Sequence, residues 1–255
     1  MRIALFSDIH ANLPALEAFF KDVDQEKIDS IYCLGDLVGY NIWPNEVVNE
    51  IRKRRIPCIA GNYDEGIGLN IPECGCAYKT DEDRAMGKIS IAYTNEIIGD
   101  AERKFLKQLP RHIRIEFLMG SKKSSLLLVH GSPRKINEYL FEDREESSFT
   151  RILDDANADI LCFGHTHKPY HRQFANCSNG GYKHAINIGS VGKPKDGNPQ
   201  GGYVILTINE ELGWENLDSI HVEFKRFDYN IEKAATAIED SALPNAYAEM
   251  LRKGV

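Results

Sequence analysis

Residues 3–10 read Ile3-Ala-Leu-Phe-Ser-Asp8-Ile-His10, an apolar run that leads directly into an aspartate and a histidine. Runs of four or five apolar residues are typical of strands buried on both faces. An apolar run followed at once by Gly, Asp, Asn or His occurs five times, at residues 3–6, 30–34, 57–60, 126–129 and 160–163. Each of the five polar groups should therefore lie just beyond the carboxyl end of a strand.

Helical patterns separate the first three apolar runs. Apolar residues recur at helical spacing over residues 13–23, around Pro14, and over residues 47–51, after Pro44. Alternation of strand and helix predicts right-handed crossovers and parallel neighbouring strands. In such sheets the ligand crevice lies beyond the carboxyl ends of the strands. We therefore expect the five polar groups to converge there, although they are far apart in the chain.

The composition is that of an ordinary globular protein. A chain of 255 residues is long enough for one large α/β domain. Its apolar runs are far shorter than the roughly 20 residues that a membrane helix requires, so we expect no membrane span. Ser7 and Asp8 interrupt the first apolar run before a signal peptide can develop. The expected location is therefore cytoplasmic.

Charge and cysteine content narrow the class of partners. The 31 Lys and Arg against 38 Asp and Glu give a formal net charge of −7, and the basic residues are scattered, which disfavours binding to long nucleic acid. Reduced thiols fit a cytoplasmic protein, and Cys74-Gly-Cys76 is too close-set for an ordinary zinc pair, so we predict a loop there. The six cysteines, which form no spaced framework, are Cys33, Cys58, Cys74, Cys76, Cys162 and Cys177.

The rest of the chain predicts one domain over residues 1–255, because no linker or internal repeat is present. Residues 66–110 read as a loop followed by two helices, at 81–98 and 100–109, and are placed to form a cap insertion over the crevice. We further predict strands at 113–117, 203–208 and 220–227, and helices at 149–156, 231–238 and 246–251, the last two being the C-terminal helices of about 231–251.

The side chains beyond the predicted strands share the ability to bind metal through carboxylate, amide or imidazole groups. They are Asp8, His10, Asp36, Asn62, His130, His165 and His167. In Asp-x-His and His-x-His the two ligands lie on the same side of an extended backbone, so we expect each pair to chelate one ion. Seven ligands are too many for one tetrahedral ion but suit two divalent ions, with Asp36 as the natural bridge.

Any one of these residues taken alone is better explained as a packed histidine or a helix cap. Five strand ends that all carry metal-competent groups would be an odd coincidence, so the whole set indicates a metal site. Two divalent ions, two aspartates and a hydroxide leave a charge of about +1 facing the crevice, and such a site recruits phosphate esters. The predicted reaction class is metal-assisted phosphoester hydrolysis.

The ordered motifs resemble the calcineurin-like metallophosphoesterase superfamily, and most closely its small prokaryotic phosphodiesterase branch. They are Asp8-Ile-His10, Gly35-Asp36, Gly61-Asn62-Tyr63-Asp64, His130-Gly131 and Gly164-His-Thr-His167, within about residues 1–210. The resemblance implies an α/β protein built as a four-layer α/β/β/α sandwich of two mixed sheets. It also implies a phosphodiesterase, rather than a monoesterase, that hydrolyses small phosphate esters such as nucleotides with metal-activated hydroxide.

The resemblance further implies how the ligands divide between two divalent transition-metal ions, such as manganese, iron or zinc. One ion would be held by Asp8, His10 and His167, the other by Asn62, His130 and His165, with Asp36 bridging both.

Tyr63 departs from the family pattern, which has a histidine that is thought to protonate the leaving oxygen, oriented by the acid that follows it. The unperturbed pKa of tyrosine is near 10 against about 6.5 for histidine, so tyrosine is a weaker acid. Tyr63 either donates a proton, or only packs over the metals or stacks a substrate base. Asp64 either steers Tyr63 or closes a turn. The departure leaves a second hypothesis, a catalytically impaired metal- or nucleotide-binding regulatory or scaffold protein of the same fold.

Two further residues are candidates for binding a substrate phosphate. Asn12 follows His10 by two residues, and Arg134 lies just after the His130 loop. Each has a plainer alternative, because Asn12 suits a helix cap and Arg134 suits a surface charge. We expect substrate selectivity to reside in the loop at residues 66–88.

Overall fold

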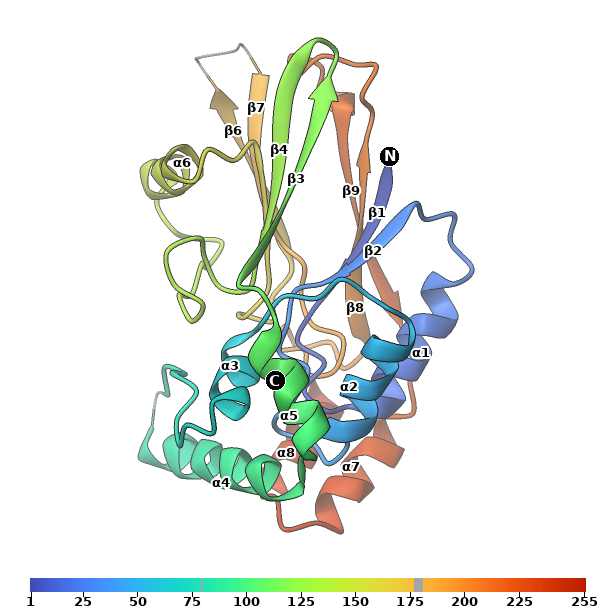
Figure 1. The fold of residues 1–255 in the computed structure, drawn as a ribbon, viewed down its shortest axis with the longest axis vertical. Helices are drawn as coiled ribbons and strands as arrows, with labels where there is room; N and C mark the ends of the chain where they lie inside the picture. Colours follow the sequence, from blue (N-terminus) through green and yellow to red (C-terminus); the bar gives the residue numbers. More distant parts are fainter. Residues whose placement is uncertain (79, 177–180) are drawn as a thin grey trace.

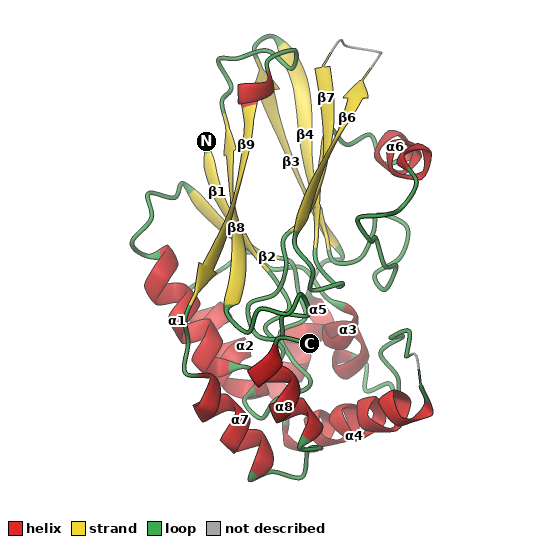
Figure 2. Ribbon diagram, turned by 180° about the vertical axis from the view of Figure 1, so that it is seen from behind, coloured by secondary structure: helices red, strands yellow, loops and turns green. Residues whose placement is uncertain are grey.

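The structure, a computed structural model, describes residues 1–78, 80–176 and 181–255, so Cys177 lies outside the described residues. Two mixed β-sheets lie face to face (Figures 1 and 2). The first has the strand order β2-β1-β8-β9, with β1 (Arg2–Phe6), β2 (Ser30–Cys33), β8 (Gly201–Ile208) and β9 (Ile220–Phe227). The second has the order β3-β4-β5-β7-β6, with β3 (His112–Met119), β4 (Lys122–Val129), β5 (Ile160–Phe163), β6 (Tyr170–Asn176) and β7 (Gly181–Asn187).

Successive side chains of a strand point to opposite faces of its sheet, so one strand packs against two different layers. Ile3 and Leu5 of β1 point into the core between the sheets, whereas Ala4 and Phe6 belong to a core shared with helices. Strand β4 is divided in the same way between the inter-sheet core and helix α6 (Glu146–Asp155). Because these strands serve two cores at once, both of their faces must be apolar, which explains the continuous apolar runs. Three cores separate four layers, and the predicted fold class is confirmed.

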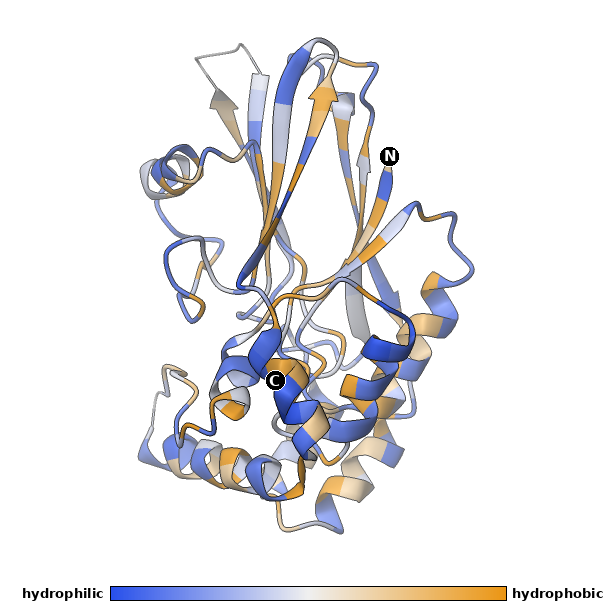
Figure 3. Ribbon diagram, in the orientation of Figure 1, coloured by the Kyte–Doolittle hydropathy of each residue, from blue (hydrophilic) through white to orange (hydrophobic). Residues whose placement is uncertain are grey.

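The other helices gather toward the end of the sheets at which β1 finishes (Figures 1 and 2). They are α1 (Leu13–Val23), α2 (Pro44–Lys53), α3 (Asn62–Gly68), α4 (Asp81–Ile97), α5 (Asp100–Gln108), α7 (Ile231–Glu239) and α8 (Ala246–Lys253). A short 3-10 turn at Leu217–Ser219 lies at the opposite end of the sheet, directly before β9 (Figure 2). Figure 3 shows hydrophobic and hydrophilic residues alternating along them, as in helices with one buried face. No described helix is long and apolar enough to cross a membrane.

One local prediction was wrong, and one helix was not predicted. Residues 57–60 do not form a strand of either sheet, since they make only an isolated parallel bridge between Cys33 and Cys58. Pro57 has no N–H to donate, and its carbonyl accepts one hydrogen bond from the Cys33 N–H at 3.0 Å. Helix α3 was not predicted, because its seven residues are too few to show an apolar periodicity.

The loop after β7 holds the loop after β1. The Val191 N–H donates to the Ser7 carbonyl and the Gly192 N–H to the Asp8 carbonyl, each at 3.0 Å. The Ser190 hydroxyl also donates to the Asp8 carbonyl, at 2.7 Å. These contacts join the two sheets at the edge where the predicted ligands lie.

We expect Gly192→Ala to lower the free energy of unfolding by about 3 kcal/mol, at the upper end of overpacking costs. A Cβ on Gly192 would lie 1.8 Å from the carbonyl oxygen of Ile9, and this backbone atom has no room to move. Urea unfolding measures the change. Gly202→Ala is the matched control, since its Cβ would lie 3.4 Å from the flexible guanidinium of Arg226. Equal losses in the two variants would contradict the close-packing argument.

Candidate metal centre

The seven predicted ligands lie directly after strands or, for Asn62, at the first residue of α3, and all are buried. The structure brings six of them into two groups whose ligand atoms lie within 4.8 Å of one another. The first group is Asp8, His10 and His167, and the second is Asp36, His130 and His165. Residues from both sheets therefore meet at one edge.

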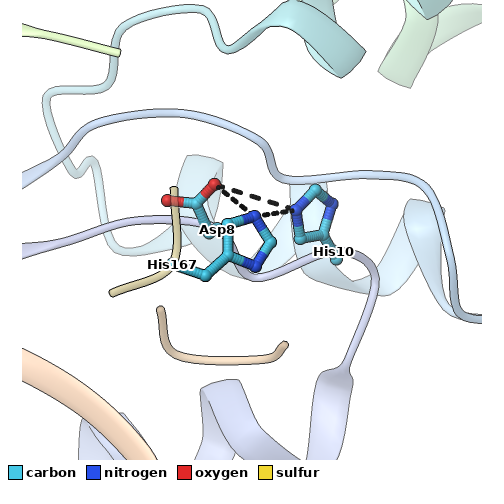
Figure 4. A group of neighbouring side chains, drawn as sticks. All are labelled: Asp8, His10 and His167. Atoms are coloured by element: carbon cyan, nitrogen blue, oxygen red, sulfur yellow. Dashed lines mark hydrogen bonds and ion pairs between the residues drawn. The ribbon is translucent and has the colours of Figure 1, made fainter. Parts of the chain in front are cut away.

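The first group is shown in Figure 4. The Asp8 Oδ1 atom lies 3.1 Å from Nε2 of His167 and 3.8 Å from Nε2 of His10. The two imidazole Nε2 atoms lie 3.3 Å apart. Three ligand atoms thus face one small volume.

Asp36 lies between the two groups. Its Oδ2 atom is 3.3 Å from Nε2 of His130 and 3.6 Å from Nε2 of His10. Asn62 joins the second group through its Oδ1 atom, 3.1 Å from Nε2 of His130. The Asn62 amide is held in this orientation because its Nδ2 donates to the Cys74 carbonyl at 2.8 Å. The Cys74-Gly-Cys76 segment is a loop, and this contact makes it part of the support of the site.

Three imidazoles donate a hydrogen bond through Nδ1, which leaves the lone pair of each neutral ring on Nε2. Nδ1 of His10 donates to the Val38 carbonyl at 3.0 Å, and Nδ1 of His130 donates to the Leu34 carbonyl at 2.8 Å. Nδ1 of His167 donates to the carbonyl of Lys193. A carbonyl only accepts, so the proton of each neutral ring is on Nδ1. This is the arrangement in which proteins present histidine to a metal.

Lone pairs that face one another repel, and a cation between them removes this repulsion. The Nε2 atoms of His10 and His167 are two such acceptors, 3.3 Å apart. In addition, Asp8 Oδ1 and His165 Nε2 are buried without a hydrogen-bond partner, which is costly for a polar atom. Both orphaned atoms belong to the ligand groups. The residues present therefore fit divalent metal ions.

The electrostatics of the site point the same way. Burial lowers the pKa values of His10 and His165 to about 3, so both rings are neutral at pH 7. For His130, burial alone would lower the pKa, but the nearby carboxylates of Asp36 and Asp8 have the larger effect. The pKa of His130 is therefore raised to about 10. Burial raises the pKa of Asp8, but His167 and His130 outweigh it and hold it well below its usual range. The buried carboxylates of Asp8 and Asp36, beside the neutral imidazoles of His10 and His165, attract a cation.

The backbone at the ligands corrects the predicted geometry of the paired motifs. Asp8, His10, Asp36, His165 and His167 have φ values of 55°, 49°, 54°, 64° and 59°, so they are left-handed and not extended. His165 and His167 accordingly face different groups instead of chelating one ion. A left-handed conformation costs a non-glycine residue roughly 1–2 kcal/mol, and it persists only where the surroundings impose it.

Tyr63 is buried beside the first group. Its ring centroid lies 5.4 Å from that of His10 and 4.8 Å from that of Tyr40. Its hydroxyl has no hydrogen-bond partner, and burial together with Tyr40 and Cys76 raises its pKa well above 10. Asp64 lies in the first turn of α3, where it accepts from the Leu37 N–H at 2.8 Å and the Gly61 N–H at 2.9 Å.

In the structure Asn12 makes the contacts of a helix cap, and Arg134 makes those of a surface charge. The Asn12 Oδ1 atom accepts from the Ala15 N–H and caps α1, and its Nδ2 donates to the Gly192 carbonyl at 2.9 Å. Arg134 pairs with Glu138, its Nε donating to Oε2 at 3.0 Å. A phosphate would have to displace these partners, so neither residue is used in the proposals below.

A pocket of about 190 Å³ opens beside the centre. Four tyrosines and two lysines line it, namely Tyr40, Tyr78, Tyr139, Tyr247, Lys193 and Lys195. The ring of Tyr139 lies 4.1 Å from that of His165, which places the pocket against the second group. The sequence analysis missed these residues, because their pocket is assembled from α8, the loop before α4 and the loops after β2, β4 and β7. The signal in the sequence that could have indicated this pocket is the Gly192-Lys-Pro-Lys195 stretch, which carries both lysines.

Comparisons with known proteins agree over nearly the whole chain. Residues 1–211 match the model of the calcineurin-like phosphoesterase superfamily domain. An uncharacterized protein of Methanocaldococcus jannaschii is 33% identical over 268 residues, covering 99% of this chain and 98% of the relative. The fold is similar to a metallophosphoesterase from Sphaerobacter thermophilus (TM-score 0.72, 28% identity, 100% and 99% covered). It is also similar in fold to a hypothetical protein from Pyrococcus horikoshii OT3 (TM-score 0.77, 21% identity, 100% and 98% covered).

Proposed function

This chain belongs to the calcineurin-like phosphoesterase superfamily, and we propose that it is a binuclear metal-dependent phosphodiesterase acting on small phosphate esters such as nucleotides. One observation carries the proposal: the buried Nε2 atoms of His10 and His167 lie 3.3 Å apart while both Nδ1 atoms donate to carbonyls, an arrangement that favours a cation between the two rings. The position of Asp36 Oδ2, within 3.6 Å of both His10 and His130, supports a second cation that shares this carboxylate.

The proposed ligands divide as the family pattern implies. Asp8, His10 and His167 would hold one ion, and Asn62, His130 and His165 the other, with Asp36 shared. When bound, two divalent ions such as manganese, iron or zinc polarise a phosphoryl group and supply a hydroxide nucleophile at neutral pH.

The chain itself orients the proposed metal ligands and shapes the site around them. The carbonyls of Val38, Leu34 and Lys193 fix three imidazole rings, so little reorganisation is needed when a substrate arrives. The ring of Tyr139 lies against the ring of His165 and excludes water from that side. The left-handed residues aim their side chains at the same volume.

The pocket supports a small substrate that carries an aromatic group. Its tyrosines offer faces on which a nucleobase can stack. Its volume of about 190 Å³ and the net charge of −7 disfavour a long nucleic acid. Residues of the 66–88 segment form one wall, namely Cys76 and Tyr78 of the loop before α4 and Met86 of α4 itself, so we assign substrate selectivity to this segment. We favour a diester over a monoester because the motifs resemble the phosphodiesterase branch.

The test is turnover by purified, metal-analysed protein. With manganese we expect two ions per chain and hydrolysis of bis(p-nitrophenyl) phosphate faster than of p-nitrophenyl phosphate, together with hydrolysis of 2′,3′-cyclic nucleotides or dinucleotides. Chelation should lower the rate by about 10²-fold or more, and added manganese should restore it. Metal-loaded protein that hydrolyses none of these esters would instead support a regulatory or scaffold protein. One ion per chain at saturation would contradict the binuclear centre.

A further inference from the structure

The side chains of two lysines of the pocket take no part in the proposed metal centre. Lys193 and Lys195 both line the pocket, together with Tyr40 and Tyr247. Lys193 is 4% exposed, and Lys195 is partly buried. A buried ammonium group is costly unless an anion or several acceptors compensate it.

The backbone holds both lysines against the first ligand group. The carbonyl of Lys193 accepts from Nδ1 of His167, and the Lys195 N–H donates to the carbonyl of His167 at 3.3 Å. The Lys193 N–H in turn donates to the Ser190 hydroxyl at 2.8 Å. The two lysines are therefore placed at a constant position relative to a predicted metal ligand.

Neither ammonium group has an anionic partner among residues 1–78, 80–176 and 181–255. The Lys193 Nζ atom lies 5.0 Å from the ring centroid of Tyr40 and 5.9 Å from that of Tyr247, and its hydrogen-bond acceptor is the sulfur of Met250 at 3.7 Å. By contrast, Lys183 pairs with Asp154 and Lys225 with Glu26. Cation–π contacts contribute only about 0.5–2 kcal/mol each, less than a buried charge requires.

We propose that Lys193 and Lys195 form a second anion subsite, which binds a phosphate of the substrate other than the one being hydrolysed. The inference rests on the proposed function and narrows its substrate class. A cyclic nucleotide carries one negative charge, which the metal centre alone would accommodate. Two further cations in the same pocket favour a nucleotide ester with at least two phosphates, its base against the tyrosines.

The test compares two non-substrate probes by calorimetry on manganese-loaded protein: AMP, with one phosphate, and α,β-methylene-ADP, with two. We expect the wild type to bind α,β-methylene-ADP at least tenfold more tightly than AMP. In the Lys193→Met/Lys195→Met variant this ratio should fall below threefold, with the affinity for AMP nearly unchanged. The Lys193→Arg/Lys195→Arg variant, which keeps both charges, should retain most of the ratio.

The control is Lys21→Met, which removes an exposed lysine of α1 and should leave the ratio unchanged. Metal content and thermal unfolding of each variant show whether the centre is intact, and single Lys195→Met is the milder variant if the double variant does not fold. Equal weakening of both probes, an unchanged ratio, or no binding of either probe to the wild type would overturn the subsite. The measurement needs no turnover, so an inactive protein that still shows the expected ratio would contradict the phosphodiesterase and not the subsite.

Discussion

Asp36→Asn should release tightly bound metal from both groups and lower the turnover of bis(p-nitrophenyl) phosphate by about 10³-fold or more. The reason is the position of one oxygen, Asp36 Oδ2, 3.6 Å from Nε2 of His10 in one group and 3.3 Å from Nε2 of His130 in the other. An amide at this place removes a negative charge from both ions at once. Elemental analysis after gel filtration measures the metal, and release of nitrophenolate measures the rate.

The substitution is designed to leave the fold intact. Asp36 Oδ1 accepts from the Tyr63 N–H at 2.9 Å, and an asparagine Oδ1 accepts equally well. Asparagine also tolerates the left-handed backbone at this position, where φ is 54°. Asp240→Asn, at the exposed C-terminal end of α7, is the matched control and should change nothing. Two retained ions with more than a tenth of wild-type activity in Asp36→Asn would contradict the shared carboxylate.

The sequence predicts which polar side chains gather at this edge of the sheets, and it does so for a physical reason. Buried strands need apolar residues on both faces, so a polar residue directly after such a run is conspicuous. The parallel pairing of β1 with β2 and of β4 with β5 then brings those residues to the same edge. No long-range contact has to be known for this step. The four-layer arrangement follows from the family resemblance and from the same two-faced strands.

What the sequence does not predict depends on backbone conformation and distant packing. The left-handed turns that separate His165 from His167 have no residue signature here, because histidine is neither glycine nor asparagine. The capping role of Asn12 requires knowing that Gly192 lies beside it. The lysine pocket requires knowing that α8 returns to the loop after β7. Each of these is a contact between residues far apart in the chain.

Tyr63 is the position at which this chain departs most clearly from its family pattern, and its surroundings define a sharp experiment. The ring is packed beside His10 and Tyr40, and its hydroxyl has no hydrogen-bond partner. Its pKa lies well above 10, because burial and neighbouring groups disfavour the phenolate. Such a hydroxyl stays protonated at neutral pH but is a weak acid.

We expect Tyr63→His to raise the rate on esters with alkoxide leaving groups by about 10- to 100-fold, within the usual range of general acid catalysis. The unperturbed pKa of an imidazolium, near 6.5, lies well below that of tyrosine, so it is the stronger acid, and alkoxides need a proton on departure. Nitrophenolate leaves without one, so turnover of bis(p-nitrophenyl) phosphate should change by less than about threefold. A 3′,5′-dinucleotide and the aryl diester, assayed on the same metal-loaded preparation, give the comparison.

Tyr63→Phe separates a proton donor from a packing residue in the same assay. Phenylalanine keeps the ring beside His10 and Tyr40 and removes only the hydroxyl, which has no hydrogen-bond partner to lose. If Tyr63 donates the proton, the dinucleotide rate falls and the aryl rate stays. If Tyr63 only packs, both rates stay while Tyr63→His still accelerates the dinucleotide. An equal change on both esters in Tyr63→His would show that the substitution acts through the metal ligands, and the proton-donor role of this position would then be wrong.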